Sequence, residues 1–219
     1  MGNNKSGYGN ITDCKKYLEE KYGGKVELIS EKSLEMRCFT TKVFESEEKN
    51  CSLTAITRVL AYYGDKGYAG IEKSVPDIYK TVKSTAWGNG YTLKRGTNPT
   101  KIDNIIKKVL GGYGYKKAKC RGIYAWGFKP EVKKEIDADR PVIMNITRGY
   151  YAKHSVTVCG YKIYKVTKKW LFGSRKINGY MIEVYDGWSE KKKYIDYKLF
   201  ADDLINYGIG SFNTLNMCE

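Results

Sequence analysis

The chain has 219 residues, of which 42% are hydrophobic and 14% aromatic, a composition that excludes a disordered chain. A chain of this length buries a substantial core in one large domain or two small ones. Its net charge of +15 would attract anionic partners: nucleic acid, a membrane surface or the anionic polymers of a bacterial wall. A lysine-rich solubility surface explains the same charge. No recognition helix or RNA-binding motif accompanies it, so we expect no specific nucleic-acid partner.

The first two thirds of the chain show mostly helical periodicity. Helices are predicted over residues 11–23, 51–63, 74–87, 98–114 and 129–140. Gly64 is predicted to end the second helix, and Asn98 or Thr100 to cap the fourth. Residues 25–44 alternate enough to suggest strands or an extended arm, and residues 45–50 are a polar loop. A strand is predicted over residues 141–146.

From residue 154 the period changes to two, which is typical of strands. Strands are predicted over 154–166 and 180–188 with a loop over 167–179, followed by a strand and a helix within 192–208. Helices that precede an antiparallel sheet indicate an α+β fold. We expect an N-terminal arm over 1–40, a helix plus an extended segment, packed on a main domain over 41–219. No apolar run reaches the roughly 18 residues of a membrane span, so no transmembrane segment is expected.

The six cysteines show no CxxC pair and no zinc-type spacing, and there is a single histidine, so neither a metal nor a cofactor is expected. Cys51 opens an apolar helix, where the helix dipole and the unpaired N–H groups would favour a thiolate. Asn50 is a good cap residue, and Ser52 keeps the first turn small and polar. The alternative is a buried structural cysteine.

His154 and Asp186 stand at the start and end of two strands that can form a hairpin. Pairing them requires the hairpin to centre on Trp170, which lies in the predicted loop. An imidazole would accept a thiol proton, and a carboxylate on its far nitrogen would orient it. Trp188 would shield that contact from water. The alternatives are a structural histidine and an Asp-Gly turn.

Three motifs, NCSLTAITRVLAYYG, KHSVTVCGY and VYDGW, together resemble the papain-clan cysteine peptidases of bacteria. They are most similar to the group related to bacteriocin-processing peptidases, the C39-like group, over roughly residues 43 to 205. The resemblance implies a papain-like fold in which a helical half carries the nucleophile helix against an antiparallel sheet. It also implies that Cys51 is the nucleophile, His154 the general base and acid, and Asp186 the orienting carboxylate.

The family resemblance also implies a secreted or cell-surface bacterial protein, with the cytoplasm as the alternative. Residues 1–10 contain no apolar leader. We expect a peptide or protein substrate, and an anionic surface or wall polymer as a partner of the basic surface.

The sequence departs from the family pattern around the nucleophile. The relatives usually carry a glutamine about six residues before the cysteine, whereas this chain has Glu45 there and contains no glutamine at all. A carboxylate at this position would repel a developing oxyanion unless protonated. The Cys51 backbone N–H remains one donor, and Asn50 or Ser46 would supply a second.

Four functions therefore stay open from the sequence. The first is a thiol hydrolase that cleaves peptide or amide bonds through an acyl-enzyme. The others are an acyl transferase of the transglutaminase kind, a wall amidase, and an attenuated or inactive papain-like binding module. The wall amidases usually carry Asp-Cys-Ser and His-Val-Gly, whereas this chain has Asn50-Cys51-Ser52 and His154-Ser155-Val156.

Overall fold

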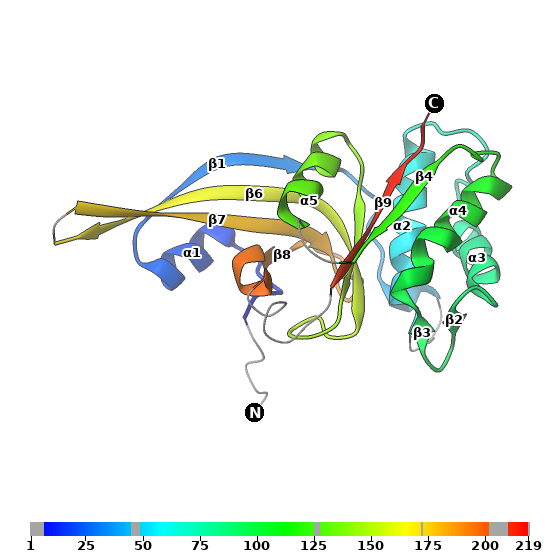
Figure 1. The fold of residues 1–219 in the computed structure, drawn as a ribbon, viewed down its shortest axis with the longest axis horizontal. Coiled ribbons are helices and arrows are strands. Elements are labelled where there is room, and N and C mark those ends of the chain that lie inside the picture. Colours follow the sequence, from blue (N-terminus) through cyan, green and yellow to red (C-terminus); the bar gives the residue numbers. More distant parts are fainter. Residues whose placement is uncertain (1–6, 45–48, 125–127, 172, 202–209, 219) are drawn as a thin grey trace.

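A computed structural model describes residues 7–44, 49–124, 128–171, 173–201 and 210–218. It has a helical half and a sheet half, as an α+β papain-like fold requires (Figure 1). The helices are α1 (Cys14–Tyr22), α2 (Cys51–Asp65), α3 (Val75–Ala86), α4 (Ile102–Gly112) and α5 (Phe128–Asp137), with short 3₁₀ turns η1 (Thr41–Phe44) and η2 (Pro99–Lys101). The strands are β1 (Lys25–Ser33), β2 (Tyr91–Thr92), β3 (Gly96–Thr97), β4 (Lys119–Ile123), β5 (Val142–Ile146), β6 (His154–Trp170), β7 (Gly173–Tyr185), β8 (Lys193–Asp196) and β9 (Ser211–Asn216).

Helix α2 is the centre of the helical half and is buried from Ser52 through Tyr63. It extends to Asp65, so the prediction that Gly64 ends it is wrong: Gly64 lies inside the last turn, packed closely against Ile71. Arg58 of this helix is buried, at 1% exposed, and its guanidinium forms hydrogen bonds to two neighbouring segments. It donates to the Phe39 carbonyl and, at 3.0 Å, to the hydroxyl of Thr157 in β6. Burial lowers the pKa of Arg58 to about 10, so it is still a cation at neutral pH.

The main sheet is antiparallel, with the order β4-β9-β5-β6-β7-β8. Along one edge of β6, strand β5 pairs with His154–Val158 and β1 with residues 160–167. Sequence periodicity did not predict β4 and β9. Both strands are short, and they pair with each other although about 90 residues separate them in the chain. The strand predicted within 192–208 is β8. Of the helix predicted after it, the structure describes residues 197–201, and the remaining predicted part lies outside the described residues.

The predicted loop over residues 167–179 is wrong. Strands β6 and β7 continue through it, and the last pair of the hairpin is Trp170 with Gly173. Thr157 pairs with Tyr185, and a bulge then shifts the register, so the hairpin centres beyond Trp170. The lysines and glycines of this stretch predicted a loop. The outer end of the hairpin is exposed, and strands with both faces in water show no apolar alternation from which they could be predicted.

The segment over residues 1–40 contributes α1 and β1. Asp13 caps α1 by accepting from the Lys16 N–H at 3.0 Å, and Gly23 ends it with φ +60°. Beneath β1 a second small core unites the N-terminal segment with the hairpin; its buried members are Ile11, Cys14, Leu18, Val26, Tyr164, Val166 and Met181.

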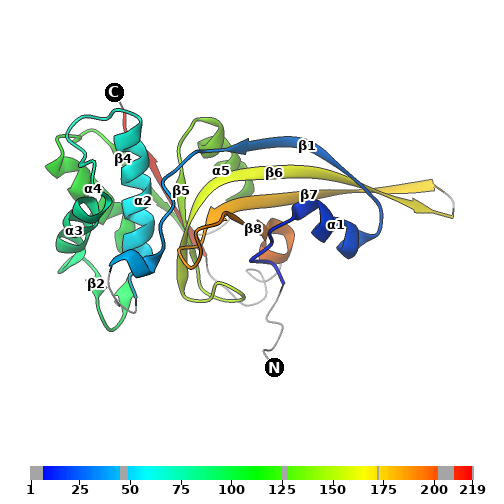
Figure 2. The ribbon, with the colours of Figure 1, turned by 180° about the vertical axis from the view of Figure 1, so that it is seen from behind.

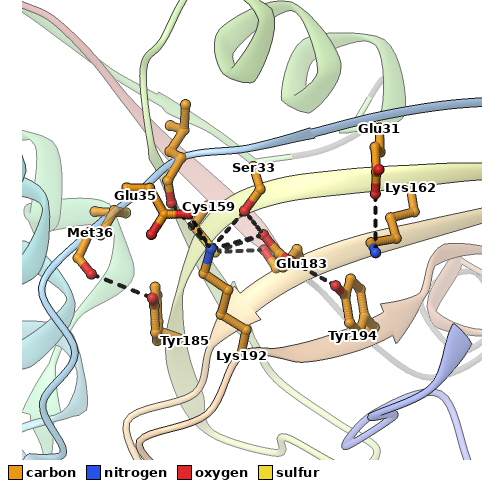
Figure 3. Close-up of polar contacts among 11 residues, drawn as sticks. Glu31, Ser33, Glu35, Met36, Cys159, Lys162, Glu183, Tyr185, Lys192 and Tyr194 are labelled. Carbon is orange, nitrogen blue, oxygen red and sulfur yellow. Dashed lines mark hydrogen bonds and ion pairs between the residues drawn. The ribbon is translucent and has the colours of Figure 1, made fainter.

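A polar cluster around Glu183 fastens β1 to the hairpin (Figure 3). The Lys192 ammonium lies 2.7 Å from the Ser33 hydroxyl and 3.6 Å from the buried Glu183 carboxylate. Tyr194 donates to the other carboxylate oxygen at 2.7 Å, and Ser33 also donates to Glu183. Strand β1 is therefore held by charged contacts as well as by its ladder.

Candidate active site

The candidate site lies where the N-terminus of α2 meets the start of β6. Cys51 is the first residue of α2, and His154 is the first residue of β6. The residues that follow them are joined, since the hydroxyl oxygens of Ser52 and Ser155 lie 2.8 Å apart in the buried interior. This contact brings the half-buried Cys51 thiol within hydrogen-bonding reach of the His154 imidazole.

One ring nitrogen of the His154 imidazole has a main-chain hydrogen-bond partner. Its Nε2 lies 2.6 Å from the main-chain carbonyl oxygen of Asp186. A carbonyl only accepts hydrogen bonds, so Nε2 carries the proton. The neutral ring therefore presents the Nδ1 lone pair, which is the form that accepts a proton from a thiol.

The environment of Cys51 favours its thiolate. Burial raises the pKa of the thiol, but the hydrogen bond and charge of His154, the Ser155 backbone N–H and the Ser52 side chain outweigh it. Together they lower the pKa from 9.0 to about 7. By contrast, burial raises the pKa of Cys14 and of Cys120 to about 12. Cys51 is thus chemically distinct from these two thiols.

Asp186 meets His154 through a different atom from the one predicted. Its carboxylate accepts from the backbone N–H groups of Trp188 at 2.9 Å and Ser189 at 3.0 Å, and so closes the turn that follows β7. Gly187 has φ +74° in this turn. The residue therefore serves both as the Asp-Gly turn and, through its carbonyl, as the partner of the imidazole.

Two aromatic rings cover the imidazole. The Trp188 ring centroid lies 4.4 Å from that of His154, and this tryptophan is 48% exposed, so it lies on the solvent side of the imidazole. Tyr151, which the sequence did not single out, is fully buried and stacks at 6.1 Å and 19°. Its hydroxyl lies 3.5 Å from the Asp186 carboxylate.

The N-terminal segment holds Tyr151 in place. The Tyr8 hydroxyl donates to the Arg148 carbonyl at 2.7 Å and accepts from the Tyr151 N–H at 3.1 Å. The Asn10 N–H lies 3.3 Å from the Tyr151 hydroxyl. A side chain on Gly149, which has φ +77°, would overlap the Tyr8 ring. A contact across 143 residues of sequence has no local signal, so sequence reasoning missed it.

Of the three residues predicted to help bind the oxyanion, the structure describes Asn50. Asn50 takes the N-cap position of α2. Contrary to the prediction, its side chain makes no capping hydrogen bond to the helix. Its amide nitrogen instead donates to the Thr41 carbonyl at 3.1 Å, because η1 lies against it. Ser46 and Glu45 lie outside the described residues.

A buried polar chain runs behind the site. Ser155 donates to the Asn145 side-chain oxygen at 2.6 Å, and the Asn145 amide nitrogen donates to Ser211 at 3.0 Å and Asn213 at 2.8 Å. With the Ser52 contact, these hydrogen bonds connect α2 to β6, β5 and β9. Sequence reasoning missed it because its members belong to four distant segments.

A thiol at a helix N-terminus beside an imidazole on an antiparallel sheet is the arrangement of papain-like cysteine peptidases. The sequence matches the model of the Peptidase_C39 like family over residues 25–207, and the chain belongs to this family. No curated protein matches it significantly. The family is one of cysteine peptidases, whose substrates are peptides or proteins. Tyr8 and Asn10 lie outside the matched residues. No helix among the described residues is long and apolar enough to cross a membrane.

Proposed function

We propose that this protein hydrolyses peptide or amide bonds, with the Cys51 thiol as nucleophile and His154 as general base and acid. The observation that carries the proposal is the imidazole held between two partners. Its Nε2 donates to the Asp186 carbonyl at 2.6 Å, and its other nitrogen is left for a thiol whose pKa is lowered to about 7.

The reaction follows from this geometry. Nδ1 of His154 accepts the thiol proton, and the Cys51 sulfur attacks the substrate carbonyl carbon. The imidazolium then returns the proton to the leaving amine, the C–N bond breaks, and an acyl-enzyme forms. In the second half His154 takes a proton from water while the water oxygen attacks the thioester carbon. The C–S bond then breaks, the carboxylic acid leaves, and the imidazolium returns its proton to the Cys51 sulfur. The Asp186 carbonyl keeps the ring oriented in both halves.

The oxyanion would be bound at the start of α2. The backbone N–H of Cys51, in the first turn of α2, is the first donor, and the second proton of the Asn50 amide is our preferred second donor. Asn50 is 3% exposed and its amide is held by the Thr41 carbonyl, so it is preorganised. Ser46 and Glu45 remain the other candidates. Loss of one such donor typically slows turnover by about 10²- to 10³-fold.

Two alternatives use the same site. The missing glutamine supports an attenuated or inactive binding module, and an acyl transferase would use the same thiol and imidazole with an amine in place of water. We further propose that residues 1–40 act as an arm that supports the catalytic domain over 41–219. A location outside the cytoplasm rests on the family resemblance alone.

The test is alkylation by iodoacetamide between pH 4 and 9, measured at each cysteine by mass spectrometry. A thiol with a pKa of about 7 has about 100 times more thiolate at pH 6 than one with a pKa of 9. Burial raises the pKa of the Cys38 thiol above 9.0, so Cys51 should label far faster than Cys38, although Cys38 is exposed. His154→Ala should remove most of this advantage, because burial then dominates. Equal labelling of Cys51 and Cys38 at pH 6 would refute the proposed pair.

Turnover separates the three functions. A peptide mixture incubated with the protein, with and without an added primary amine, is analysed by mass spectrometry. Hydrolysis products support the peptidase, and amine adducts support the transferase. A reactive Cys51 without any product supports the binding module. Cys51→Ser is the negative control in each case.

A further inference from the structure

The outer end of the β6–β7 hairpin projects from the molecule. Figures 1 and 2 both show its tip extending past α1 and β1. The ladder with β1 ends at the pair Lys25 and Thr167, so the pairs beyond it are made by β6 and β7 alone. This end is therefore a free ribbon.

The ribbon is strongly and uniformly basic. Residues 161–182 contain no acidic residue and six basic ones. Lys162 pairs with Glu31 of β1 at 3.1 Å and Lys165 stands opposite Glu27, whereas Lys168, Lys169, Arg175 and Lys176 lie beyond β1. The last four of these are exposed. Lys168 stands directly opposite Arg175 in the ladder. Like charges in such a pair destabilise a hairpin, so folding does not account for them. An anionic partner would.

An apolar tip accompanies these charges. The sequence between Lys169 and Ser174 is Trp-Leu-Phe-Gly. Leu171 is 90% exposed, the highest exposure among the exposed large apolar residues of the described chain. A surface that serves solubility alone has no use for an exposed leucine among cations. Cations flanking an apolar residue match the boundary between anionic headgroups and acyl chains.

We propose that the outer end of the β6–β7 hairpin binds the surface of an anionic lipid bilayer, with its four exposed cations on the headgroups and Leu171 at the acyl boundary. The candidate active site lies at the opposite end of β6, at His154. The 17 residues of β6 are separated by sixteen steps of about 3.3 Å and so span roughly 50 Å, and a bilayer at the tip therefore leaves the site open to substrate.

The test is sedimentation with vesicles of 70% phosphatidylcholine and 30% phosphatidylserine, compared with pure phosphatidylcholine. The wild type should bind only the anionic vesicles. Since each basic residue contributes about fivefold, reversing Lys168, Lys169, Arg175 and Lys176 to Glu should weaken binding at least a hundredfold. The matched control reverses four exposed lysines of the helical half to Glu: Lys73, Lys80, Lys116 and Lys117. It changes the net charge equally and should retain most of the binding.

Two results would overturn the proposal. One is an equal loss of binding in both quadruple variants, which would mean that net charge alone attracts the protein. The other is a Leu171→Ser variant that binds vesicles as tightly as the wild type while heparin competes fully, which would mean a soluble polyanion as partner. Iodoacetamide labelling of Cys51 should be unchanged in all these variants. It reports that they are folded and keeps this test separate from that of the proposed function.

Discussion

Replacing Tyr8 by Phe tests whether the N-terminal segment supports the candidate active site. The substitution keeps the ring, which is fully buried, and removes only the hydroxyl. The Tyr151 N–H and the Arg148 carbonyl then lose their partner. A buried polar group left unpaired costs about 1–3 kcal/mol, and one of these two is only partly buried. We therefore expect the free energy of unfolding to fall by about 2–3 kcal/mol.

Urea unfolding measures this loss. With a slope of about 2 kcal/mol per M, the midpoint should fall by about 1–1.5 M. A second measurement tests positioning: Tyr151 stacks on His154, so a loosened Tyr151 should weaken the hold of His154 on the Cys51 thiolate. The pH midpoint of Cys51 alkylation should then rise above its value of about 7.

Tyr124→Phe is the matched control, because this tyrosine is 40% exposed and belongs to neither α2 nor β6, the elements that carry Cys51 and His154. It should change the unfolding free energy by less than about 0.5 kcal/mol and leave the alkylation profile unaltered. If Tyr8→Phe is no more destabilising than Tyr124→Phe, the reasoning from the buried contacts is refuted. If stability falls while the alkylation midpoint stays in place, the positioning argument is refuted and only the structural one stands.

Gly187→Ala forces a side chain into φ +74°, which costs about 1–2 kcal/mol, and it should move the Asp186 carbonyl from the imidazole. Calorimetry and Cys51 labelling at pH 7 should show a lower melting temperature and slower labelling; an unchanged pair of values would contradict the role of this turn. Glu183→Gln leaves the 22%-exposed Lys192 ammonium without its buried counter-charge and should lower the unfolding free energy by about 1–2 kcal/mol. Glu35→Gln removes a 93%-exposed carboxylate from the same ammonium, so a loss as large there would show that burial is not the cause.

The local elements were largely readable from the sequence. Apolar spacing gave α2 through Leu53, Ile56 and Leu60, all of which are fully buried. Asp13 and Gly23, at the two ends of α1, are residues whose local chemistry favours a cap and a stop. Cys51 and His154 were identified because each opens an element, and α2 and β6 begin at these two residues.

The loop predicted over 167–179 failed for a physical reason. Periodicity detects an element only when one face is buried, and the outer hairpin has water on both faces. Strands β4 and β9 were missed because five or six residues give too few periods, and their partners lie about 90 residues away in the chain.

The sequence by itself determined which chemical groups the protein has and where its helices begin, because propensity, capping and periodicity act over a few residues. Tertiary structure decided which atoms meet. It selected the carbonyl of Asp186 in place of the carboxylate, since the Asp-Gly turn uses the carboxylate for its own N–H groups. It also placed Tyr8 against Tyr151 and linked Ser155 to Asn145. Such contacts depend on strand register and on turns far apart in the chain, and no local pattern records them.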